Sequence, residues 1–307
     1  MSRSLIRTML LAGATFSLAA CGGGGGSGGG SGLVSTPTPP PPPTPTPYNL
    51  VKIFPDVTIS TDFAVLGLEA SAYNLPASSL TKTGFSVRYD AASSAYVLDF
   101  PSTQPGSFHA FDSNSRFWNG SLTDPSTVGG IQPIVVDVFK PSPANPDFQL
   151  SYTTFAQYSY DSSPFGVVAF GTPTPGSAVP STGSATYNAY VAGTTNDSVY
   201  YIRGSATLNF NFGAGTLSGQ FNPLLYDLTG GALSLGQYNF QNTVFGVGST
   251  AFSGGLRHSS NNLTGMFDGL FTGPNAQELM ARWTASYVNP DTQKNGEMFG
   301  VWVGKRP

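Results

Sequence analysis

The stretch GMFDGLFTGPNAQELMARWTASY, Gly265 to Tyr287, decides the fold because it contains both strand-like and helix-like sequence. Its first part alternates small and aromatic residues, and one face of the alternation carries Gly265, Phe267, Gly269 and Phe271. Small and large side chains in alternation suit the inner face of a small, tapering β-barrel. We therefore predict a strand in which the glycines let neighbouring aromatic rings lie across the backbone.

The middle of the stretch departs from this alternation. The pair Gly273–Pro274 is followed by the helix formers Ala276–Ala281, and alternation resumes at Trp283. The glycine suits a tight turn, and the proline suits the first position of a short helix, where its missing N–H costs nothing. We predict a helical turn whose Leu279 and Trp283, four residues apart, cover one end of a barrel. We interpret the turn as a corner of the fold. Glu278 is its only charged residue of a type used in catalysis, and it lacks a partner residue.

The same period-two pattern extends over the sequence from Gly183 onward. The run SATLNFNF, residues 205–212, places four apolar side chains on one face, and places Thr207, Asn209 and Asn211 on the other. Further runs of this kind give eight candidate strands after Gly183, a number that closes into a barrel. This part of the sequence predicts an all-β fold with an eight-stranded antiparallel β-barrel.

The sequence between Tyr48 and Gly183 also consists of short alternating runs, without a long amphipathic helix. Residues 84–100 predict a hairpin around 90–94, and residues 133–139, 147–160 and 165–171 predict further strands. The run GTPTPGSAVPSTG, residues 171–183, is rich in proline and glycine and marks a boundary. We predict a smaller β subdomain over residues 48–180, followed by the barrel over 181–307.

The first twenty-one residues have the layout of a secretory signal. Arg3 and Arg7 precede the apolar run TMLLAGATFSLAA, which is too short to span a bilayer stably, and Cys21 follows it. The tetrapeptide LAAC, residues 18–21, resembles the lipobox of bacterial lipoproteins. That resemblance implies cleavage before Cys21, acylation of its thiol and amino terminus, and, with Gly22 in place of aspartate, an outer-membrane location. The alternative is ordinary signal-peptidase cleavage beside an incidental cysteine.

Residues 21–47 predict a lipidated cysteine followed by a tether. The glycine-rich run 22–32 predicts a flexible coil of roughly 18 Å root-mean-square length. The run TPTPPPPPTPTP, residues 36–47, predicts a polyproline II rod of roughly 37 Å. Such a spacer holds the folded region away from the lipid surface.

The composition excludes several classes of function. Charged residues make up 9% of the 307 residues, and the formal net charge is −3 with 13 lysines and arginines, so no nucleic-acid-binding patch is expected. The sequence has a single cysteine, so no second cysteine is present to form a disulfide with it. Because the thiol of Cys21 is predicted to carry lipid, no cysteine remains as a nucleophile or as part of a zinc cage. Abundant Gly, Ser, Thr, Asn and aromatic residues are typical of extracytoplasmic β proteins.

Several runs together resemble the β-barrel domain of transferrin-binding protein B-like surface lipoproteins. The runs are PSTGSATYNAYVAG, GSATLNFNFGAGTLSGQF, FSGGL, GMFDGLFTGPNAQEL and GVWVGKR, in the order of that family and over roughly the last 125 residues. The resemblance implies an eight-stranded barrel preceded by a β "handle" subdomain. This chain has one such pair where full transferrin-binding proteins have two, and Met280-Ala281 replaces the family's Gly-Gly after Glu278.

Candidate catalytic residues are few. The two histidines, His109 and His258, lie on separate predicted subdomains, and their spacing supports neither a metal site nor a Ser-His pair. Asp268 and Glu297 are candidates for paired carboxylates on neighbouring strands. Isolated acidic residues on the solvent-exposed face of a sheet are, however, far commoner. The string GAGTLSG, residues 213–219, fits a hairpin better than a dinucleotide loop or a nucleophile elbow. We expect no enzyme, no catalytic residue, no metal and no bound cofactor.

Aromatic side chains are the remaining binding candidates. Six of them cluster near the predicted junction of the two subdomains, namely Tyr152, Phe155, Tyr158, Tyr160, Tyr200 and Tyr201. Exposed aromatics anchor protein interfaces, although most aromatics in such a chain belong to the core. Haem is an alternative ligand, with Tyr or His as its axial ligand, but the sequence singles out no residue for that role.

Two functions of different classes follow. The first is an outer-membrane lipoprotein, displayed on the cell surface and monomeric, that captures an extracellular ligand. The resemblance implies an iron- or haem-related protein or solute as that ligand, and an outer-membrane transporter as its recipient. The second is a structural or envelope-maintenance lipoprotein in the periplasm, without a nutrient ligand.

Overall fold

The computed structural model describes residues 50–53, 60, 63–71, 86–92, 95–99, 106–108, 117–123, 133–139, 149–160, 163–197, 199–226, 231–241 and 243–307. The chain forms two compact units, Met1–Thr46 and Pro47–Pro307, and every described residue belongs to the second. Cys21, the predicted lipid-attachment residue, and His109 lie outside the described residues.

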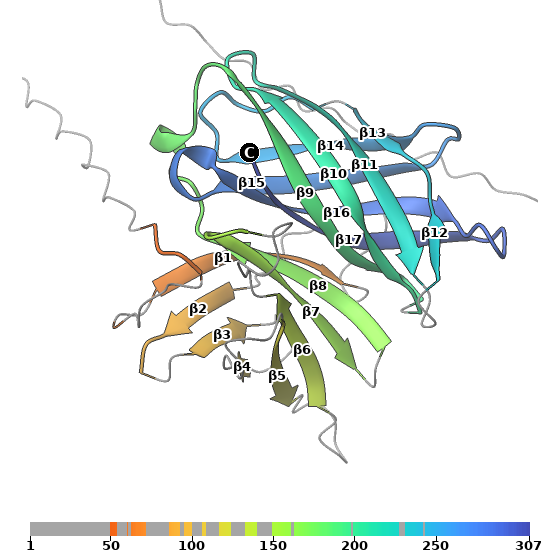
Figure 1. Cartoon of the computed structure of the whole chain (residues 1–307), viewed down its shortest axis with the longest axis horizontal. Helices are drawn as coiled ribbons and strands as arrows, with labels where there is room; N and C mark the ends of the chain where they lie inside the picture. Colours follow the sequence, from red (N-terminus) through yellow and green to blue (C-terminus); the bar gives the residue numbers. More distant parts are fainter. Residues whose placement is uncertain are drawn as a thin grey trace, which may run out of the picture. The chain divides into compact units, whose positions relative to one another are not determined.

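The first sheet is antiparallel and contains eight strands in the order β4-β3-β2-β1-β8-β7-β6-β5 (Figure 1). The strands are β1 (Phe63–Ser71), β2 (Ser86–Asp90), β3 (Ala95–Asp99), β4 (Gly106–Phe108), β5 (Phe117–Thr123), β6 (Pro133–Phe139), β7 (Thr153–Tyr160) and β8 (Ser163–Gly171). The predicted hairpin is confirmed, because β2 and β3 pair from Ser86↔Asp99 to Asp90↔Ala95.

The second sheet closes on itself as an eight-stranded antiparallel barrel. Its strands are β9 (Ser184–Thr195), β10 (Tyr201–Asn211), β11 (Thr216–Tyr226), β13 (Tyr238–Gln241), β14 (Ala251–His258), β15 (Thr264–Thr272), β16 (Glu278–Val288) and β17 (Asn295–Lys305), and the short β12 (Ala232–Ser234) pairs with β11. Closure comes from two pairings, β9 with β17 and β10 with β11. The predicted fold class, a barrel preceded by a smaller β subdomain, is confirmed.

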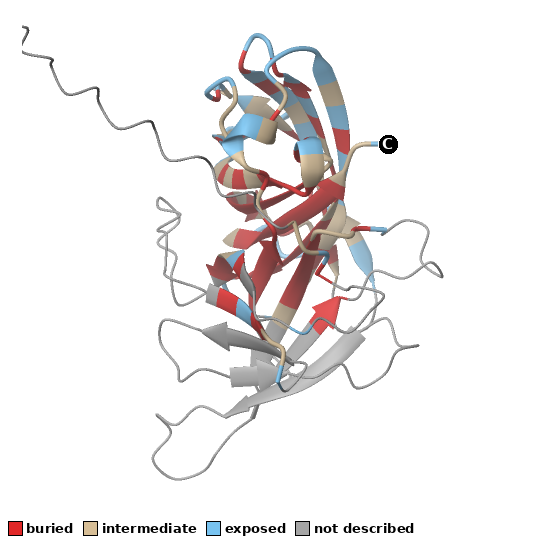
Figure 2. Cartoon of the chain, turned by 90° about the vertical axis from the view of Figure 1, so that its left-hand side faces the viewer, coloured by how far each residue is buried: buried red, intermediate tan, exposed pale blue. Residues whose placement is uncertain are grey.

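The barrel interior is filled by the side chains that the alternation predicts to point inward. Leu208, Phe210, Phe267 and Phe271 all belong to one buried cluster. Figure 2 shows in red the buried residues among those that the structure describes. Phe252 lies across Gly269, its partner on the neighbouring strand, where an added Cβ would come within 2.5 Å of the ring. Gly269 therefore has the role that the sequence predicts for it, whereas Gly265 makes room for Ala285 rather than for an aromatic ring.

The predicted helical turn at 274–281 is wrong in its extent. Only Pro274–Ala276 forms a short 3-10 helix, η2, and β16 begins at Glu278. The proline does stand at the start of this turn, and Gly273 has a φ of 72°, a conformation that favours glycine. Leu279 and Trp283 lie in the strand, where a spacing of four also puts them on one face, and both point into the barrel core rather than covering its end.

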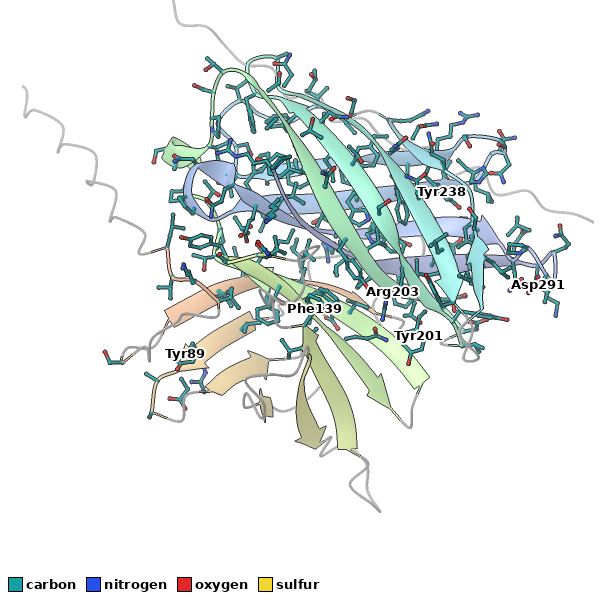
Figure 3. All side chains as sticks on the ribbon, in the orientation of Figure 1. Tyr89, Phe139, Tyr201, Arg203, Tyr238 and Asp291 are labelled. Carbon is teal, nitrogen blue, oxygen red and sulfur yellow. The ribbon has the colours of Figure 1, made fainter. Side chains whose placement is uncertain are left out.

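A second buried cluster joins the two sheets. Phe139, Phe155, Val167 and Ala169 of the first sheet pack against Ala192, Met280, Val301 and Val303 of the barrel. The ring of Phe139, which Figure 3 labels, stacks on the ring of Phe155 with centroids 5.1 Å apart. Phe155 stacks in turn on Tyr190 of β9 at 5.6 Å. The two sheets therefore share a core, and the division into domains at residues 180 and 181 stays a prediction.

Candidate functional site

A cavity of about 610 Å³ lies where β1 of the first sheet faces β14, β15 and β16 of the barrel. Its lining is mainly apolar and includes Leu66, Leu68, Val244, Leu270, Asp268 and Arg282. The lining residues come from both sheets, so the cavity exists only when the sheets are packed together. Its volume falls within the range of about 300–1,000 Å³ that is typical of ligand sites.

Aliphatic side chains stand exposed around this cavity. Among the described residues, four large hydrophobic side chains are exposed, and three of them are here: Leu66 (47%), Val244 (73%) and Val247 (53%). Val247 follows Gly246, which lines the cavity. We call Leu66, Val244 and Val247 the aliphatic rim. Contiguous exposed apolar surface beside a cavity marks interaction sites more often than scattered single residues do.

An ion pair forms the polar part of the cavity wall. Asp268 of β15 and Arg282 of β16 are direct neighbours in the sheet, and Arg282 Nε donates to Asp268 Oδ1 at 2.8 Å. The arginine side chain is 3% exposed and the aspartate 27%. Glu69 of β1 also lines the cavity, and it is 7% exposed. Asp268 is thus the more accessible of the two carboxylates in the cavity wall.

Asp268 and Glu297, the candidate carboxylate pair that we expected to be the rarer case, do not lie on neighbouring strands. Asp268 lies on β15 and Glu297 on β17, and β16 separates the two strands in the sheet. Glu297 instead accepts a hydrogen bond from the Ser286 hydroxyl at 2.7 Å. The partner that sequence reasoning missed is Arg282. The hairpin register could have identified it, because strands that turn about residue 275 bring residue 268 opposite 282.

Glu278 is buried, and its predicted lack of a partner is wrong. The backbone N–H groups of Ser151 and Tyr152, in the segment before β7, donate to its two carboxylate oxygens at 2.6 and 2.8 Å. Burial raises the pKa of Glu278 to about 7, against the opposing effects of these N–H groups, of Thr153 and of Lys305. The residue therefore joins the barrel to the first sheet, and its position is structural.

His258 also has a structural role. Its Nε2 donates to the carbonyl oxygen of Leu235 at 3.0 Å, and its Nδ1 accepts from the N–H of Ser260 at 3.2 Å. Its ring packs edge-on against Tyr238 at 4.9 Å. With both nitrogens engaged, the imidazole is available neither to a metal nor to a nucleophile. No group of three or more His, Cys, Asp or Glu residues that could hold a metal occurs in the described ranges.

The predicted aromatic cluster does not form a single site. Phe155 is buried between the sheets, Tyr152 lies beside Gly273, and Tyr200 packs against the barrel core. Tyr201 is the first residue of β10, and the Arg203 guanidinium carbon lies 5.4 Å from the centre of its ring (Figure 3). Arg203 also donates a hydrogen bond to the Gln157 side chain. The Tyr158 and Tyr160 side chains are outside what the structure describes.

None of the described helices is long and apolar enough to cross a membrane.

Comparison with known proteins gives matches among solved structures only. No protein-family model matches the sequence. No curated protein matches it either. A transferrin-binding protein B variant from Haemophilus parasuis is 17% identical, and the match covers 80% of this chain and 45% of that one with a TM-score of 0.47.

Two further solved structures match at a similar level. HpuA from Kingella denitrificans, in complex with human haemoglobin, is 15% identical over 85% of this chain and 91% of that one, with a TM-score of 0.36. Transferrin-binding protein B from Neisseria meningitidis is 15% identical over 80% and 43%, with a TM-score of 0.43. The chain spans less than half the length of these transferrin-binding proteins. Two of these three structures are transferrin-binding protein B, the family that the sequence runs resemble.

Proposed function

We propose that the protein is a non-enzymatic outer-membrane lipoprotein, attached through Cys21 and displayed on the cell surface, that captures an extracellular iron- or haem-related ligand for uptake. The observation that carries this proposal is the aliphatic rim around the cavity between the sheets. Water-exposed Leu66, Val244 and Val247 stabilise nothing in the isolated chain, but they gain free energy when a partner covers them. One matched protein is a transferrin-binding protein and another was solved in complex with human haemoglobin, so transferrin and haemoglobin are the first ligands to test.

The signal-like sequence and tether support the localisation. Several acyl chains on Cys21 would anchor the chain permanently, because each buried methylene contributes about 0.8 kcal/mol and one chain alone is marginal. A Cys21→Ser variant is expected to leave the membrane fraction. Protease treatment of intact cells, with a periplasmic protein as leakage control, is expected to remove the folded region. Full protection with clean controls would contradict surface display and favour the envelope-maintenance alternative.

Capture is tested with the aliphatic rim. Intact cells are incubated with transferrin, haemoglobin and haem, and the bound ligand is quantified against cells that lack the protein. The double variant Leu66→Ser, Val244→Ser is expected to lower binding at least tenfold, since two exposed aliphatic contacts are lost. Val199→Ser is the matched control, because Val199 is 45% exposed and does not line the cavity. Equal loss in the control would contradict the assignment of this surface.

A further inference from the structure

We propose that the cavity receives a basic side chain of the captured partner, with aliphatic neighbours on either side of it. Asp268 Oδ2 would accept the hydrogen bond from the ammonium or guanidinium group. This inference rests on the proposed function and names the chemistry of the partner segment at the same site.

The state of the ion pair gives the first argument. A carboxylate offers about four acceptor positions, and Arg282 Nε occupies one of them on Oδ1. Asp268 lines the cavity and its side chain is 27% exposed, so its carboxylate can be reached from the cavity. A second cation can therefore bind this carboxylate without breaking the existing pair.

The burial of Arg282 gives the second argument, which concerns the sign of the ligand's charge. Its side chain is 3% exposed and directed at Asp268, so its guanidinium is hardly available to a solute in the cavity. The accessible charged group of this pair is consequently the Asp268 carboxylate, and the third charged residue of the lining, Glu69, is also acidic. An anionic ligand would meet the Asp268 carboxylate at close range, and the lining cation, Arg282, is hardly accessible to offset the repulsion.

The apolar lining gives the third argument. Leu66, Leu68 and Leu270 line the cavity around the carboxylate. Lysine and arginine bury their methylene stems along apolar surface and keep the charged end at a polar group, which matches this arrangement. The cavity of about 610 Å³ is larger than the volume of one such side chain. Aliphatic residues next to it in the partner segment can therefore pack against the aliphatic rim.

The test uses side-chain mimics on the full chain. Methyl-labelled leucine and valine report binding by NMR, with Leu66, Leu68, Val244 and Leu270 as local probes, during titration with n-butylguanidinium, n-butylammonium, 1-butanol and n-butyrate. We expect the two cations to bind at least fivefold more tightly than 1-butanol, and butyrate to bind least. Equal affinity for butyrate and butylguanidinium would overturn the proposal.

Variants locate the binding. Asp268→Asn is expected to remove the preference for cations over 1-butanol, and Leu66→Lys, at an exposed position that leaves the ion pair intact, is expected to weaken cation binding at least fivefold. Asp291→Asn, in the exposed β16–β17 turn, is the charge-matched control and should change nothing. Unchanged cation binding in both Asp268→Asn and Leu66→Lys would overturn the proposal.

The outcomes separate this inference from the proposed function. A protein that binds butylguanidinium at Asp268 but captures no ligand on cells would contradict the proposed function alone. A protein that captures a ligand through the aliphatic rim but shows no cation preference would contradict this inference alone.

Discussion

Trp283 fills the middle of the barrel because two glycines on neighbouring strands leave room for its ring. Gly193 and Gly300 lie directly opposite each other, and an added Cβ would come within 2.9 and 2.6 Å of Trp283 Cζ2. The indole also packs against Phe221 with ring centroids 4.7 Å apart. The absence of side chains at Gly193 and Gly300 therefore makes room for the Trp283 ring in the core.

Gly300→Ala is therefore expected to lower the free energy of unfolding by about 1–3 kcal/mol, the usual cost of overpacking a filled core. Urea denaturation followed by tryptophan fluorescence measures it. Gly213→Ala is the control, since an added Cβ there would have its nearest neighbour at 3.7 Å. A Gly300→Ala variant as stable as the control would show that the core accommodates the extra methyl group.

At this scale the sequence predicted the core better than the site. Inward residues follow from alternation, and Leu208, Phe210, Phe267 and Phe271 are buried as predicted. The aliphatic rim could not be predicted, because an exposed valine and a buried one have the same local sequence pattern. Only the packing of distant segments, such as β1 against β16 and β17, determines which aliphatic residues remain outside.

Among the elements, β16 explains why a helix was predicted where a strand exists. Its residues 278–285 are buried on both faces, with Leu279, Ala281 and Trp283 in the barrel core and Met280 against the first sheet. A strand buried on both faces loses the alternation of polar and apolar residues, so its run of Glu, Leu, Met and Ala resembles a helix. Local propensity was overridden here by tertiary packing.

The carboxylate at the start of β16 makes stability depend on pH. Because burial raises the pKa of Glu278 from 4.5 to about 7, the folded chain holds this proton more tightly than the unfolded chain does. The resulting stabilisation is complete below pH 4.5 and is lost as the pH rises through about 7. Between pH 5 and pH 8 this change amounts to about 2 kcal/mol.

Glu278→Gln is expected to remove this part of the pH dependence, which urea denaturation at pH 5, 6.5 and 8 would measure. Tyr187→Phe is the control, because the Tyr187 hydroxyl donates to the Ala276 carbonyl in the same turn and burial raises the pKa of Tyr187 above its usual value. It should cost about 1 kcal/mol equally at each pH. An unchanged slope in Glu278→Gln would mean that other groups carry the dependence.

At the scale of the whole molecule, a shared core joins the two sheets. Met280, Val301 and Val303 lie on the outer face of the barrel, yet they are buried, since Phe139, Phe155 and Val167 cover them. The sequence predicted both sheets separately but not this contact. This contact depends on which outer faces meet, and an apolar residue on an outer face does not indicate which segment covers it.

Residues 181–307 expressed alone are therefore expected to aggregate or bind hydrophobic dyes, although the barrel contains its own interior core. The complete folded region should unfold in one transition. Calorimetry and dye binding of both forms would test this. A soluble, dye-free barrel with the thermal midpoint of the full chain would contradict a shared core. The triple variant Met280→Thr, Val301→Thr, Val303→Thr in the isolated barrel should restore some solubility.

The barrel closes by pairing β9 with β17, its first strand with its last, from Met298↔Thr195 to Lys305↔Asn188. During synthesis, β9 emerges more than a hundred residues before its partner exists. Until then the aromatic interior has no complete wall, and the non-local pairing that seals it cannot form. The barrel can therefore close only when β17 is available, and until then β9 is an open edge that another strand could pair with.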